Sequence, residues 1–188
     1  TLPRFTLIGA TTRMALLPAP FRNRFGAIFQ FEYYQENEIG NIVDQSAGIL
    51  HIPIDERATA LIAARSRYTP RIANRILKRI RDFALIEGQG HITEDIASKG
   101  LSFFEVDEYG LESGDRRMLE AIITKFGGGP VGIQALAATT SEEQETILDV
   151  YEPYLLRLGF IERTPKGRVA TSKAYKHMGL SGPQKDFL

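Results

Sequence analysis

Apolar residues recur every three to four positions through the middle of the chain, which predicts a block of amphipathic helices. The clearest stripe consists of Ile72, Ile76, Ile80 and Phe83. Thr69 and Pro70 stand just before this stripe, at the N-cap and first helical positions that favour these residue types. Further helices are expected over residues 35–50, 55–66 and 93–101. We therefore predict an all-helical domain over residues 35–104.

Two short apolar runs in the N-terminal part predict strands instead, over residues 5–10 and 27–31. A short helix or turn is expected between them, over residues 21–26. The first run ends at Thr11, so the strand would deliver polar side chains at its carboxyl end, where α/β sheets place ligands. This order is typical of part of an α/β sheet.

An acidic, glycine-containing connector over residues 104–114 marks the best candidate for a domain boundary. Helices are predicted after it over residues 116–126, 133–139 and 142–158, and strands over 160–163 and 168–171. Three helices followed by a hairpin is the winged-helix arrangement. We assign it to residues 105–180 and interpret residues 181–188 as a tail.

Composition excludes several classes of protein. The chain has no cysteine and only three histidines, which argues against disulfides and a zinc site. No apolar run approaches the ~18–20 residues that span a bilayer, so a cytoplasmic location is expected. The formal net charge is zero, but residues 65–82 hold seven basic residues and one acidic, and residues 157–176 hold six and one. Such segregation permits local anion-binding faces.

Several motifs, in order and at family spacing, resemble the RuvB family. They lie at residues 7–13 (LIGATTR), 24–26 (RFG), 69–73 (TPRIA), 128–132 (GGPVG), 152–155 (EPYL), 163–168 (RTPKGR) and 174–177 (AYKH). The resemblance covers nearly the whole chain. It implies a mostly α-helical fold with small β elements: the end of an AAA+ ATPase core over residues 1–34, the helical lid over 35–104 and a winged helix beyond.

The resemblance also implies a function. RuvB-family proteins are ATP-dependent helicases or translocases that use ATP and Mg²⁺, form hexameric rings on duplex DNA and act at Holliday junctions with RuvA. The printed sequence has no Gly-x-x-x-x-Gly-Lys-Thr phosphate loop and no acidic magnesium-binding strand, which the family carries upstream of this segment. We therefore expect this to be the C-terminal part of such a motor, and expect it to be inactive as an ATPase by itself.

Two candidate catalytic residues lie in the N-terminal part. Thr11 matches the polar sensor-1 residue of the family, whose hydroxyl would hold the attacking water or the γ-phosphate. The alternative is that Thr11 only satisfies the end of a strand. Arg24 matches the arginine finger, which would reach a neighbouring subunit's nucleotide and stabilise charge in phosphoryl transfer. Arg22 is its rival.

Two further residues are candidates for nucleotide binding. Arg71 matches the family's sensor-2 arginine and stands at a predicted helix start, where charge and free backbone N–H groups favour a phosphate. Tyr34 is expected near the adenine, although an aromatic residue there is equally suited to a core. Tyr68 departs from the pattern, since glycine is expected at that position. The turn before the helix is therefore expected to differ.

The predicted wing carries the candidate DNA-binding residues Arg163, Lys166 and Arg168. Such side chains hold the phosphate backbone without reading bases, which suits a protein that processes any sequence. The alternative is a solvated basic hairpin, but Glu162 is the only acid close in sequence. The preceding helix is acidic and would repel phosphates, so we expect the wing to make the contact. The acids are Glu142, Glu143, Glu145, Asp149 and Glu152.

Two other functions remain open at this point. One is a winged-helix regulatory module without ATPase activity, which would have no use for Thr11, Arg24 and Arg71. The other is a clamp-loader-like AAA+ subunit, whose C-terminal domain is a helical collar and not a winged helix.

Overall fold

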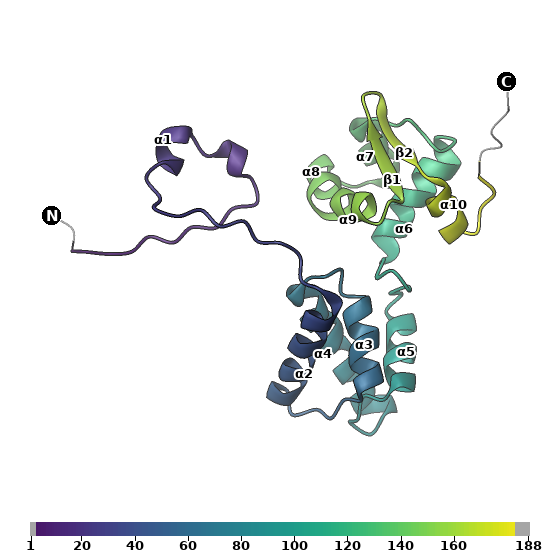
Figure 1. Cartoon of the computed structure of the whole chain (residues 1–188). Helices are drawn as coiled ribbons and strands as arrows, with labels where there is room; N and C mark the ends of the chain where they lie inside the picture. Colours follow the sequence, from purple (N-terminus) through teal and green to yellow (C-terminus); the bar gives the residue numbers. More distant parts are fainter. Residues whose placement is uncertain (1–2, 183–188) are drawn as a thin grey trace. The chain divides into compact units, whose positions relative to one another are not determined.

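The computed structural model describes residues 3–182, so most of the predicted tail lies outside the described residues (Figure 1). The chain divides into two compact units, Thr1–Glu32 and Tyr33–Leu188. None of the helices within residues 3–182 is both long and apolar enough to cross a membrane.

The N-terminal unit contains only two short helical turns among its described residues, η1 (Met14–Leu16) and α1 (Ala19–Arg22). The strands predicted over residues 5–10 and 27–31 are wrong, because both segments are extended but unpaired. A strand is completed by hydrogen bonds to a neighbouring strand, and the described residues supply none here. The apolar side chains of these segments are consequently exposed: Ile8 is 89% and Phe31 93% accessible.

The lid is a four-helix domain, and its predicted helices are confirmed. They are α2 (Glu36–Ile49), α3 (Glu56–Ala64), α4 (Pro70–Glu87) and α5 (Glu94–Phe103). Gln35 and Glu38 form a capping box at α2, and the Thr93 hydroxyl accepts from the Ile96 N–H at α5. Thr69 occupies the N-cap of α4 without capping it, because its hydroxyl donates to the Arg67 carbonyl instead. The predicted stripe packs inward, with Ile76 and Ile80 in the centre of the core.

The winged-helix domain follows and has a hydrophobic core of its own. The first helix, α6 (Ser113–Glu120), continues into a π-helical turn, η2 (Ala121–Lys125), and α7 (Ile133–Thr140) follows. The predicted acidic helix is present as three consecutive pieces: α8 (Gln144–Thr146), the π-helical η3 (Ile147–Tyr151) and α9 (Glu152–Arg157). A last helix that the pattern did not predict, α10 (Ser172–His177), begins at Thr171, whose side chain accepts from the Ala174 N–H.

The predicted wing is confirmed as an antiparallel hairpin of β1 (Ile161–Thr164) and β2 (Gly167–Ala170). Its register places Arg163 directly opposite Arg168. Val131 adds a short antiparallel bridge to β2 through two backbone hydrogen bonds with Arg168, each 2.9 Å long. The hairpin is therefore anchored to the loop before α7.

A buried ion pair joins the lid to the winged helix inside the second unit. Arg67, in the turn between α3 and α4, donates to both carboxylate oxygens of Asp115 and, through Nε, to the Gly110 carbonyl at 2.9 Å. Side-chain exposure is 9% for Arg67 and 1% for Asp115. Gly110 has a positive φ of 71° and abuts the Arg65 backbone, so a side chain would not fit there. The two domains are thus tightly joined at this turn.

Candidate nucleotide site and DNA-binding wing

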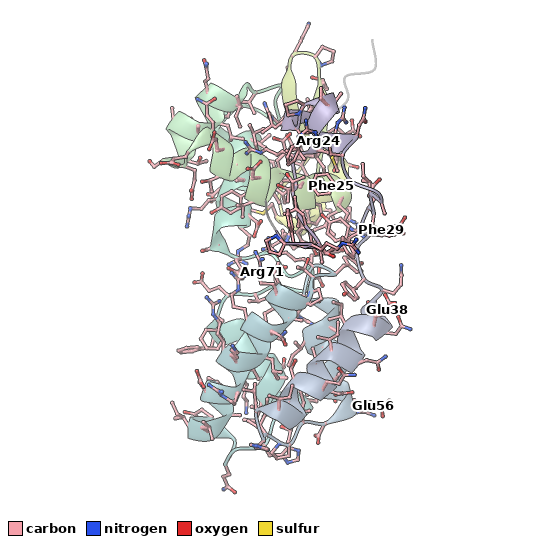
Figure 2. All side chains as sticks on the ribbon, turned by 90° about the vertical axis from the view of Figure 1, so that its left-hand side faces the viewer. Arg24, Phe25, Phe29, Glu38, Glu56 and Arg71 are labelled. Carbon is pink, nitrogen blue, oxygen red and sulfur yellow. The ribbon has the colours of Figure 1, made fainter. Side chains whose placement is uncertain are left out.

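The two candidate catalytic residues lie in exposed positions of the N-terminal unit. Arg24 (Figure 2) follows α1 and has no ion-pair partner among residues 3–182. Its neighbour Phe25 packs edge-on against Phe21, with ring centroids 5.4 Å apart. The Thr11 hydroxyl accepts a 3.0 Å hydrogen bond from the Arg13 backbone N–H. Thr11 therefore closes a local turn in this structure, and its predicted sensor role stays a prediction.

The two candidate nucleotide-binding residues stand at the starts of packed lid helices. Tyr34 immediately precedes the N-cap of α2 and is 44% exposed. Arg71 is the second residue of α4, is exposed, and has no ion-pair partner in the described part of the chain (Figure 2). A free guanidinium at a helix start is suited to an anionic group, because the helix dipole and unpaired N–H groups favour negative charge there.

The turn before α4 explains why glycine was expected at Tyr68. Both Arg67 and Tyr68 have left-handed backbone conformations, with φ of 54° and 57°. Non-glycine residues adopt this region at a cost, so glycine is the least strained choice. The Tyr68 ring is held by Arg157, whose guanidinium carbon lies 4.6 Å from the ring centroid.

The three candidate DNA-binding residues of the wing differ in solvent exposure. Lys166 is exposed at the tip, where the Thr164 hydroxyl closes the turn by donating to the Gly167 carbonyl at 2.9 Å. The Arg163 side chain is 57% exposed, whereas that of Arg168 is only 11% exposed. Lys166 and Arg163 are therefore directly accessible to a phosphate, and Arg168 is largely covered.

Both wing arginines pair with the buried carboxylate of Glu152, which the sequence pattern assigns to an exposed helix surface. Glu152 is 1% exposed; its Oε1 accepts from Arg163 at 2.6 Å and its Oε2 accepts from Arg168 at 2.8 Å. We predicted Glu152 to belong to a phosphate-repelling helix surface. Its burial and two cationic partners remove it from that surface, so it instead offsets the repulsion between two arginines paired across the hairpin.

Sequence reasoning missed three groups of residues that shape these sites: the Arg67–Asp115 pair, Glu152, and the contact of Arg157 with tyrosines. One signal was present for Glu152, which precedes Leu155 and Leu156 by three and four positions and so shares their helix face. The Arg67–Asp115 pair spans 48 positions and leaves no local signal.

The described residues contain no group of three histidine, cysteine or acidic side chains able to hold a metal ion.

The four helices, with an exposed arginine at the start of α4, are joined to a winged helix with a basic wing, and this defines the class: a helical domain that carries a winged-helix module. Three domain families match consecutive parts of the chain. They are the Holliday junction DNA helicase RuvB P-loop domain at residues 1–31, the RuvB AAA lid domain at 34–107 and the RuvB C-terminal winged helix domain at 108–179. The chain belongs to the RuvB family.

Named relatives agree with this assignment. The Holliday junction branch migration complex subunit RuvB of Dehalococcoides mccartyi is 57% identical over 179 residues, covering 95% of this chain and 51% of that protein. Its namesake from Methanoregula boonei is 52% identical over 185 residues, covering 98% and 55%. The solved structure of the Thermotoga maritima RuvB Holliday junction branch migration motor is 43% identical, with a TM-score of 0.84 over 90% of this chain and 57% of that one. The chain thus spans about half the length of the curated relatives it matches.

Proposed function

We propose that this chain forms the lid and DNA-binding part of an ATP-driven motor subunit that moves duplex arms of Holliday junctions. The observation that carries the proposal is the union, in one folded unit, of a candidate nucleotide face at Arg71 and a basic wing, joined by the buried Arg67–Asp115 pair. The relatives' names supply the substrate and the complex. A simple regulator would not need the exposed arginine at the lid.

The chemistry of the proposed nucleotide site is phosphate recognition. Arg71 binds phosphate oxygens of ATP in its own subunit, and Tyr34 stacks near the adenine. Arg24 reaches a neighbour's nucleotide, where an always-charged, forked guanidinium stabilises charge developing on the transferred phosphoryl group. Thr11 orients the attacking water. ATP binds with Mg²⁺, for which the described residues offer no ligand set.

The wing is proposed to hold duplex DNA through its backbone. Arg163 and Lys166 contact phosphates, and Arg168 takes part from its covered position beside Glu152. Backbone contacts carry no base information, so binding is independent of sequence. The partners are RuvA and further copies of the same subunit in a hexameric ring, because a finger acting in trans requires a neighbour.

The motor proposal is tested in the full-length protein that contains this sequence. Arg24→Ala should reduce ATP hydrolysis by ~10³-fold or more, the size of effect of a trans arginine, and leave nucleotide binding largely intact. Mixed rings of Arg24→Ala subunits and subunits with a disabled phosphate loop should recover part of the activity. Mixed rings that stay inactive would show that Arg24 does not act in trans. The 188-residue chain alone should show no turnover.

The DNA proposal is tested by salt titration of duplex affinity for the 188-residue chain, with two duplexes of unrelated sequence. Arg163→Ala and Lys166→Ala should each lower the slope of log affinity against log salt by ~1, equally for both duplexes. Arg57→Ala is the matched control, since Arg57 is exposed on the lid and pairs with Glu94 at 3.2 Å, far from the wing in sequence. A loss confined to one duplex would instead favour a sequence-specific regulator.

A further inference from the structure

Arg157, the last residue of α9 in the winged helix, lies against two tyrosines that flank the candidate nucleotide residues. Its guanidinium carbon is 4.1 Å from the ring centroid of Tyr33 and 4.6 Å from that of Tyr68. Both distances are within the ~6 Å range of a cation–π contact. Tyr33 adjoins Tyr34, and Tyr68 lies three positions before Arg71. One side chain of the DNA-binding domain therefore bridges the two segments that carry Tyr34 and Arg71.

A second contact fixes the same turn from the same helix. Tyr154, one turn before Arg157 on α9, lies under the Arg67 guanidinium at 4.9 Å, and its hydroxyl donates to the Tyr109 carbonyl at 2.7 Å. Arg67 is in turn held by the buried carboxylate of Asp115. Residues 154 and 157 are on one helix face, since they are three positions apart. This face of α9 thus docks on the consecutive residues Arg67 and Tyr68.

We propose that Arg157 is a positioning residue for ATP binding: it holds Tyr33 and Tyr68 together, and so sets the spacing between Tyr34 and Arg71. The proposal rests on the nucleotide roles given above for those two residues. Through Arg157, the winged-helix domain would help to hold the nucleotide-binding residues in position.

Tyr68 supplies one of the two aromatic rings that Arg157 contacts. The backbone there is left-handed, with φ of 57°, a conformation that glycine would adopt with less strain. A glycine would offer no ring to Arg157. The strain of a tyrosine at this position is thus accompanied by a contact that only a side chain can make.

The existence of the stack is tested in the 188-residue chain by a double-mutant cycle of Arg157→Ala and Tyr68→Ala, measured by urea unfolding. A coupling equivalent to a roughly two- to fivefold change in the unfolding equilibrium is expected, the size of one partly exposed cation–π contact. Additive effects of the two substitutions would overturn the proposal. Arg157→Lys should retain part of the coupling, because it keeps the cation.

The positioning role is tested by ATP hydrolysis in the full-length protein. Arg157→Ala should raise the KM for ATP by roughly two- to fivefold per ring contact, with a smaller change in kcat. Duplex affinity should be unchanged, which shows that the winged helix is folded. Arg157→Lys should restore part of the KM, and Arg57→Ala should leave it unchanged.

The outcomes separate this inference from the function on which it rests. A raised KM for Arg71→Ala together with an unaltered KM for Arg157→Ala would overturn the positioning role alone. An unaltered KM for Arg71→Ala would overturn the proposed nucleotide site itself. A parallel loss of kcat and duplex affinity in Arg157→Ala, without a change in KM, would identify Arg157 as a purely structural residue.

Discussion

The N-terminal unit and the rest of the chain contain similar apolar residues, but these residues are exposed in the first unit and largely buried in the second. None of the residues described between positions 3 and 32 is buried, and Phe29 and Phe31 are 80% and 93% exposed. In the second unit, Phe160 and Ile80 are fully buried in two separate cores. The difference lies in how each element completes its hydrogen bonds. A helix satisfies its backbone internally, whereas a strand depends on partners elsewhere in the chain.

An apolar run gains stability only where the fold supplies a surface to cover it. Helices α2 to α5 supply such surfaces to one another within about seventy residues. The extended segments around Ile8 and Phe31 have no equivalent surface among the described residues. The two kinds of apolar residue should therefore respond very differently to truncation.

The largest effect is expected in the winged-helix core. Phe160 is 0% exposed, packs edge-on against Tyr109 at 5.2 Å and stacks on His177 at 5.0 Å. Phe160→Ala should lower the free energy of unfolding by about 3–5 kcal/mol, because it removes a large buried side chain and leaves a cavity. Urea unfolding followed by circular dichroism measures this. A loss below 1 kcal/mol would show that Phe160 is not in a packed core.

An intermediate effect is expected from the ionisation of Tyr154 at the junction of lid and winged helix. Burial raises the pKa of the Tyr154 hydroxyl from 10.0 to about 12, against an opposing influence of the Arg67 cation. Because the neutral form is favoured in the folded state, its contribution is complete below pH 10 and is lost as the pH rises through about 12. The contribution is on the order of 2 kcal/mol.

This pH dependence is isolated by comparing the chain with its Tyr154→Phe variant. The phenylalanine variant should lose less stability than the parent chain between pH 10 and about 12, because it has no hydroxyl to ionise at that site. Chemical unfolding at a series of pH values gives both curves. Parallel curves would mean that Tyr154 ionises with an ordinary pKa in the folded chain.

Most of the helical architecture was predictable because its signals are local. The stripe through Ile76 and Ile80 lies within one helix, α4. The wing was predictable too, since the turn between β1 and β2 sets the register that pairs Arg163 with Arg168. The strands predicted over residues 5–10 and 27–31 are absent, since a strand forms only with a neighbouring strand and a local pattern does not show whether one is present.

The candidate sites were predictable to a smaller extent. Arg24 and Arg71 were singled out by resemblance to a family and not by periodicity. The partners that shape the sites come from distant positions: Glu152 lies 11 and 16 positions from Arg163 and Arg168. Arg157 meets Tyr68 and Tyr33 from another domain of the unit. Such contacts follow from the packing of whole domains, for which a single sequence holds no periodic signal.

The smallest effect on the free energy of unfolding is expected in the N-terminal unit. Phe31→Ser should change the free energy of unfolding of the 188-residue chain by no more than about 0.5 kcal/mol, because a side chain that is 93% exposed loses almost no buried contact. Phe160→Ala removes a fully buried ring, so the two variants contrast an exposed with a buried phenylalanine. Both are measured by the same urea titration at one protein concentration. A destabilisation by Phe31→Ser approaching that of Phe160→Ala would mean that Phe31 is covered in solution. The contrast between the two units would then fail.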